Sequence, residues 1–178
     1  MKKPYLFLIL YLFLFSCSFP NMIMVELESK NSTDVNGSVV FIEEENKVTM
    51  VARIENLVPG EHAIHLHEKS DCSSNDGKST GGHWNPTLTK HGKWGDESGF
   101  HRGDIGNFIA NENGIGTITF TTDLWCLDCD DNIKNILGKA VIVHQGIDDL
   151  TSQPSGAAGS RISCGGIISE NALISDKE

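Results

Sequence analysis

Basic residues are scarce in this 178-residue chain, where 14 Lys and Arg stand against 24 Asp and Glu for a formal net charge of -10. Nucleic-acid-binding proteins neutralise phosphates with clustered Lys and Arg, so this balance argues against a nucleic-acid partner. A net negative chain also repels small anions at long range. If the substrate is an anion, positive charge must therefore be concentrated at the mouth of the site.

Long apolar runs are also missing. The longest, Tyr5–Phe15, is too short to span a bilayer. It follows two lysines and precedes Ser16-Cys17, which is the layout of a secretory signal, and Leu14–Cys17 resembles a bacterial lipobox. We expect residues 1–16 to be a signal peptide cleaved before Cys17, which would carry a lipid anchor in the periplasm or cell envelope. The alternative is an ordinary signal peptide cut nearby.

No segment of helical length shows amphipathic spacing. From about residue 22 the pattern has period 2, as in Val48–Glu55, where Val, Met, Ala and Ile occupy one face. Extended segments are predicted at Ile23–Glu28, Ser38–Ile42, Val48–Glu55, Ala63–Glu68, Asp104–Ala110, Ile115–Thr121 and Lys139–His144. Short strands at this spacing predict an all-β fold, a Greek-key antiparallel sandwich or flattened barrel.

Two stretches, 69–103 and 145–166, are rich in Gly, Ser and Asp and lack periodicity. Loops of this length in a compact domain are usually functional or disordered, and the first holds three histidines. The chain has neither an internal repeat nor an interdomain linker. We expect a mature N-terminal segment with the first strand at 17–34, one domain at 35–168, and a tail at 169–178.

Six of the seven histidines form a candidate metal cluster. His65 and His67 are two residues apart in a predicted strand, so their side chains leave the same face, whereas His62 is out of phase and should point away. Imidazole with a carboxylate suits zinc, and imidazole alone suits copper. Six histidines and one aspartate could coordinate two ions if one histidine binds both. The other candidate ligands are His83, His91, His101, Asp104 and His144.

These residues carry a family resemblance. The motifs are His65-Leu66-His67, Gly81-Gly82-His83, His91-Gly92, His101-Arg102-Gly103-Asp104, Val143-His144 and Gly159-Ser160-Arg161 to Cys164-Gly165. In order and spacing they resemble the copper-zinc superoxide dismutases over about residues 35–168. His67–Ser74 and Thr151–Gly156 resemble the bacterial exported branch in particular.

The resemblance implies one copper and one zinc per subunit and the dismutation of superoxide to oxygen and hydrogen peroxide by alternate reduction and oxidation of copper. The implied copper ligands are His65, His67, His83 and His144, and the implied zinc ligands are His83, His91, His101 and Asp104. As the bridge, His83 would also carry a proton.

Arg161 would line the channel above copper, where a permanent cation with several donors suits a small oxyanion. Asp148 would accept hydrogen bonds from one copper and one zinc histidine, with Asp149 as the neighbouring alternative. Lys69 and Lys78 flank the first loop and are candidates for attracting superoxide, or else solvated loop lysines.

Four cysteines remain after Cys17, and the residues alone leave three disulfide pairings open. The resemblance implies a disulfide between Cys72 and Cys164. Cys126-Leu127-Asp128-Cys129 then forms either a local disulfide or a second metal or redox site.

Two other functions compete with the dismutase. One is a non-catalytic protein that binds or delivers copper or zinc on the same scaffold. A zinc hydrolase is disfavoured because four protein ligands would leave no position for water. Exported members of the resembled family include monomers and dimers, so a homodimer is compatible with the sequence.

Overall fold

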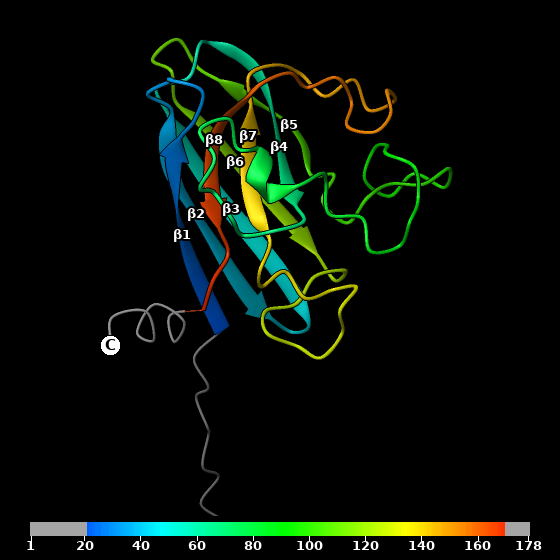
Figure 1. Ribbon diagram of the computed structural model, residues 1–178. Helices are drawn as coiled ribbons and strands as arrows, with labels where there is room; N and C mark the ends of the chain where they lie inside the picture. Colours follow the sequence, from blue (N-terminus) through cyan, green and yellow to red (C-terminus); the bar gives the residue numbers. More distant parts are fainter. Residues whose placement is uncertain (1–20, 170–178) are drawn as a thin grey trace, which may run out of the picture.

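The computed structural model describes residues 21–169, which form a closed antiparallel β-barrel (Figure 1). The strands are β1 (Asn21–Ser29), β2 (Asn36–Glu44), β3 (Lys47–Glu55), β4 (Gly60–His67), β5 (Gly106–Ala110), β6 (Gly116–Thr122), β7 (Ala140–His144) and β8 (Arg161–Gly166). Their order around the barrel is β1-β2-β3-β6-β5-β4-β7-β8. The all-β prediction is confirmed, with the barrel closed. The predicted signal peptide, Cys17 and nearly all of the tail lie outside the described residues.

Buried and exposed side chains alternate along the strands that form the barrel. In β3, Val48, Met50, Ala52 and Ile54 are fully buried while their neighbours face outward. β2 and β3 are joined by a two-residue turn at Glu45-Asn46, and both turn residues have positive φ. Such a turn matches the twist of the paired strands. The register that it fixes keeps the apolar face of β3 toward the core.

One part of the sequence interpretation is wrong. Residues 161–166, expected within the second long loop, form β8, which closes the barrel by pairing with β7 and β1. The central four residues of β8 are buried, so the strand shows no alternation of polar and apolar positions. In addition, β5 begins at Gly106, which leaves Asp104 in the preceding turn.

The two long loops follow β4 and β7, which are hydrogen-bonded neighbours in the barrel. Figure 1 shows both loops on the same side of the barrel, the first in green and the second in orange. The first contains one turn of 3-10 helix, η1 (Lys78–Thr80). No helix among residues 21–169 is long and apolar enough to cross a membrane.

Candidate metal centre

Four histidines from three parts of the chain meet at the outer surface of the barrel, beneath the long loops. His65 and His67 project from one face of β4, while Ile64 and Leu66 fill the core on the other. His144 ends β7, and His83 lies opposite His67 in an isolated bridge. One ligand atom from each of the four lies within 4.8 Å of those of the others.

A second set shares His83. Its members are His83, His91, His101 and Asp104, again with ligand atoms within 4.8 Å of one another. The Asp104 carboxylate lies 2.8 Å from Nδ1 of His83, 3.0 Å from Nδ1 of His91 and 3.3 Å from Nδ1 of His101. Its Oδ2 also accepts hydrogen bonds from the backbone N–H groups of Gly92 and His101, which fixes the carboxylate just before β5.

The donor atoms fit two metal ions. Buried polar atoms normally have hydrogen-bond partners, so a group of unpaired ring nitrogens is informative. The unpaired nitrogens are His65 Nδ1, His67 Nε2, His83 Nε2, His91 Nδ1, His101 Nδ1 and His144 Nε2. Four of these nitrogens belong to the all-imidazole set and the other two to the set with the carboxylate. All-nitrogen ligation suits copper, and three nitrogens with one carboxylate oxygen suit zinc.

Backbone carbonyls fix the orientation of two copper-side rings. Nδ1 of His67 lies 3.0 Å from the carbonyl oxygen of Gly81, and Nδ1 of His144 lies 3.4 Å from that of Gly159. A carbonyl can only accept, so each Nδ1 carries the proton and each Nε2 is left free to bind a metal.

Asp148 connects the two sets. Its Oδ2 lies 2.8 Å from Nε2 of His65, and its Oδ1 lies 2.9 Å from Nε2 of His91. These contacts leave Nδ1 of each ring free for its own ion. Asn107 holds Asp148 by accepting from its backbone N–H and donating to its carbonyl. Gly156 must lack a side chain because a Cβ there would overlap the Asp148 carboxylate.

Burial and the neighbouring carboxylates shift the pKa values of the histidines in opposite directions. Burial, together with nearby histidines and Arg161, holds the pKa of His67 and His144 well below the usual value. Burial also lowers the pKa of His83 to about 4. For His91 burial acts in the same direction, but the adjacent carboxylates of Asp104 and Asp148 outweigh it and raise the pKa to about 9. Neutral imidazole binds metals, so the copper-side rings are already in the binding form.

Arg161 begins β8 on the copper side of the centre. Its Nη1 donates to the carbonyl of Gly77 and to Oγ1 of Thr80, and Thr80 in turn lies 3.4 Å from Nδ1 of His67. Partial burial lowers the pKa of Arg161, and the charge of Asp76 opposes this change. Asp76 also forms an ion pair with the exposed Lys78, whose charge is therefore partly neutralised.

Both cysteine pairs are disulfides. Cys72–Cys164 joins the first long loop to β8 across a sequence separation of 92 residues. Because β8 also carries Arg161, this bond ties the loop that contains Gly77 and Thr80 to the strand that presents the guanidinium. Cys126–Cys129 closes a short loop between β6 and β7.

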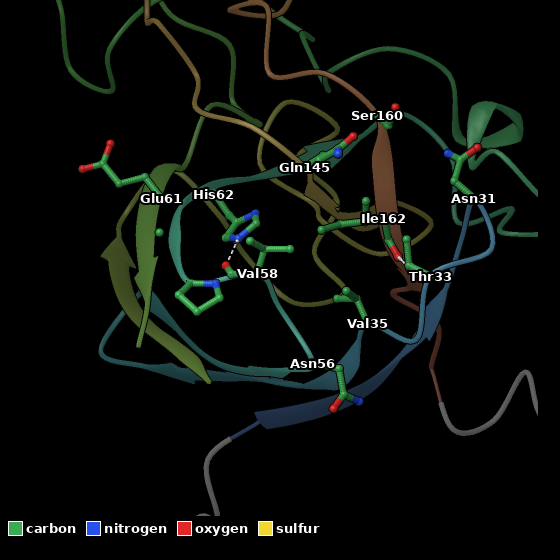
Figure 2. Close-up of a pocket in the computed structure, with 12 residues that line it drawn as sticks. Asn31, Thr33, Val35, Asn56, Val58, Glu61, His62, Gln145, Ser160 and Ile162 are labelled. Carbon is green, nitrogen blue, oxygen red and sulfur yellow. Dashed lines mark hydrogen bonds between the residues drawn. The ribbon is translucent and has the colours of Figure 1, made fainter. Parts of the chain in front are cut away.

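His62 is separate from the cluster, as its strand phase predicts. Figure 2 shows its ring at the end of the barrel, in a pocket with Val35, Val58 and Ile162. One ring nitrogen lies 2.8 Å from the carbonyl oxygen of Val58 and the other 3.0 Å from that of His144. With both nitrogens in use, His62 has none left for a metal.

Sequence reasoning missed three residues that support the centre: Thr80, Asn107 and Gln153. Gln153 accepts a hydrogen bond from the N–H of His91 and donates one to its carbonyl, so the second loop holds the first. Thr80 and Asn107 act through contacts with residues more than 40 positions away. Local patterns contain no signal for such contacts.

Comparisons with known proteins agree with this geometry. The sequence pattern of the copper/zinc superoxide dismutase (SODC) family matches residues 35–167. The chain is 35% identical over 145 residues to superoxide dismutase [Cu-Zn] 2 of Brassica juncea, covering 76% of this chain and 90% of that protein. It is 37% identical over 143 residues to the extracellular superoxide dismutase [Cu-Zn] of Drosophila melanogaster, covering 76% of each. The crystal structure of a SOD-like protein from Bacillus subtilis matches with a TM-score of 0.73 and 29% identity, over 82% of this chain and 97% of that one.

Proposed function

The chain belongs to the copper/zinc superoxide dismutase family. We propose that it converts superoxide to oxygen and hydrogen peroxide, and we assign a role in this reaction to each residue of the site. The observation that carries the assignment is the pair of buried ligand sets that share His83 and present unpaired ring nitrogens. When bound, copper supplies the one-electron redox chemistry, and zinc, which has none, supplies a fixed charge beside it.

His83 is the residue that belongs to both sites. Its Nδ1 faces Asp104 on the zinc side, while its Nε2 is unpaired on the copper side. The ring packs beside both the His65 and His91 rings, with centroids 3.9 Å and 5.4 Å away. When Nε2 is not bound to copper it can hold a proton, and because the zinc-side contacts keep the ring in place, that proton stays at the reaction site.

Arg161 binds the superoxide anion. Its Nη1 is committed to Gly77 and Thr80, which orients the guanidinium and leaves its other N–H donors for a small oxyanion. Since the net charge of the chain is -10, this local cation supplies the attraction that the chain as a whole does not.

Replacing Arg161 by Ala is expected to lower the kcat/KM for superoxide by about 10- to 100-fold, the loss expected from a hydrogen bond to a charged group worth about 1.5–3 kcal/mol. The kcat/KM of Arg161→Lys should lie between those of the wild type and Arg161→Ala, because Lys keeps the positive charge but lacks the planar guanidinium with its paired N–H donors. Pulse radiolysis on protein with verified copper and zinc content measures this. Arg53→Ala, at a half-exposed position on β3, is the matched control and should leave the rate unchanged. Equal rates for Arg161→Ala and wild type would remove Arg161 from the mechanism.

A storage or delivery protein on the same scaffold is the competing function. Such a protein has to release its metal, whereas every ligand residue here is at most 5% exposed. Two long loops cover the ligands, the first of them tied to β8 by a disulfide, and all seven ligand positions and the arginine are present. Burial of this kind favours a retained cofactor.

The protein acts outside the cytoplasm, as a member of the bacterial exported branch. Disulfides form and persist mainly in oxidising compartments, this chain has two, and one of the relatives is extracellular by its name. Residues 1–16 serve as the export signal, and a lipid on Cys17 holds the protein at the membrane surface, since Leu14–Cys17 has the form of a lipobox.

Mass spectrometry of the mature protein tests the anchor. The expected N-terminus is an acylated Cys17, and Cys17→Ser should move the protein from the membrane fraction to the soluble fraction with its dismutase activity intact. An unacylated N-terminus at another residue would rule the anchor out.

A further inference from the structure

The loop between β6 and β7 carries Cys126–Cys129, which the dismutase chemistry does not use, and it places a buried tryptophan beneath the zinc site. Trp125 is 1% exposed, and its Nε1–H donates a hydrogen bond of 2.8 Å to the backbone carbonyl of Arg102. Arg102 lies between the zinc ligands His101 and Asp104. The indole therefore holds the peptide that joins two ligands of the same ion.

Trp125 also supports the remainder of the zinc loop through ring contacts. Its ring centroid lies 5.8 Å from that of Trp94 and 5.1 Å from that of Phe120 on β6. Trp94 in turn packs against Phe100 at 4.9 Å and Phe120 at 4.8 Å. Trp94 and Phe100 both lie between His91 and His101, so this aromatic cluster attaches the ligand-bearing segment to the wall of the barrel. Each such ring pair is worth about 0.5–1.5 kcal/mol beyond the area it buries.

The position of Trp125 is set by the loop that follows it. The N–H of Cys126 donates to the carbonyl of Lys134, and the carbonyl of Cys126 accepts from the N–H of Ile136. The side-chain amide of Asn135 donates to the carbonyl of Cys129. The disulfide closes the short segment between these contacts, immediately after Trp125.

We propose that Trp125 is a positioning residue for the zinc site and that the Cys126–Cys129 disulfide acts on the zinc site through Trp125. Metal ligands must be held closely to their productive geometry by residues that do not touch the ion. Trp125 does this for His101 and Asp104 by fixing the Arg102 carbonyl, and the disulfide limits how far the indole can move. The inference rests on the zinc assignment made above.

Zinc affinity, measured by chelator competition with copper-loaded protein, tests the inference independently of catalysis. Trp125→Phe keeps the aromatic ring and removes the N–H, and we expect about 2- to 10-fold weaker zinc binding, as for the loss of one hydrogen bond. The matched control is Ile54→Val in the core of β3, which lowers stability but should leave zinc affinity unchanged. The d–d spectrum of cobalt in the zinc site should change in Trp125→Phe and stay unchanged in the control.

A double-mutant cycle tests the role of the disulfide. Replacing Cys126 and Cys129 by Ser should weaken zinc binding in the wild-type background and have little further effect in Trp125→Phe. Fully additive losses would mean that the disulfide acts by another route and would overturn the second half of the proposal. Unchanged zinc affinity in Trp125→Phe would overturn the proposal that Trp125 positions the zinc ligands. A wild-type chain that binds no zinc would instead refute the metal assignment, and this inference with it.

Discussion

Substitution of His67 by Gln is expected to remove copper and dismutase activity while zinc stays bound. His67 Nε2 is one of the unpaired nitrogens of the copper set, and its Nδ1 is held by the carbonyl of Gly81. Gln fills much of the same volume but offers no imidazole nitrogen. Loss of a residue that only supports a ligand costs about 10- to 100-fold in metal affinity, so loss of a ligand should cost more than about 100-fold. Elemental analysis and a superoxide assay on the same sample measure both quantities.

His62→Gln is the matched control because His62 lies on the same strand and is also buried. Its ring contacts the backbone carbonyls of Val58 and of the copper ligand His144 but no ligand nitrogen, so the variant should lose stability, keep its zinc and lose far less copper than His67→Gln. The zinc content of His67→Gln is an internal control because His67 is not in the zinc set. Full copper content and activity in His67→Gln would contradict the assignment.

Removal of the Cys72–Cys164 disulfide is expected to give the largest loss of stability. Closing a loop with a sequence separation of 92 restricts the unfolded chain, an effect worth about 4–5 kcal/mol in the chain-entropy model. For a chain of this size the loss corresponds to a fall in Tm of about 10–20 °C. Chemical denaturation of the metal-loaded Cys72→Ala/Cys164→Ala protein measures the free energy of unfolding.

The second disulfide provides the comparison. Cys126–Cys129 joins residues only three positions apart, so the same model gives about 2 kcal/mol or less for its removal. The first double variant should also lose activity, because the bond holds β8 and Arg161 against the loop that carries Thr80. If the two double variants lost equal stability, loop closure could not be the origin of the stabilisation.

Alternation and histidine spacing predict much of this protein from its sequence. The period of β3 gives its buried face directly, and the i, i+2 spacing places His65 and His67 together while excluding His62. β8 was missed because its centre is buried on both faces and so shows no period-2 signal. Residue spacing alone does not show that His83 binds both ions. The assignment of each ligand to copper or zinc therefore came from the family motifs.

Long-range contacts made by side chains could not be predicted. The hydrogen bond from Trp125 to the carbonyl of Arg102 joins residues 23 positions apart, and that from Arg161 to Thr80 joins residues 81 apart. Each depends on the folded positions of two segments that have no regular pattern. These contacts hold the ligands and the arginine in place. The sequence therefore predicts the metal ligands better than it predicts the residues that support those ligands.

Stepwise metal reconstitution of the purified mature protein, with superoxide removal followed at each step, tests the central claim most directly. We expect the metal-free and zinc-only proteins to be inactive and the addition of copper to restore activity, reaching its maximum at one copper and one zinc per chain. Activity in the zinc-only protein, or no activity when both sites are filled, would contradict the assignment of this centre as a copper/zinc superoxide dismutase site.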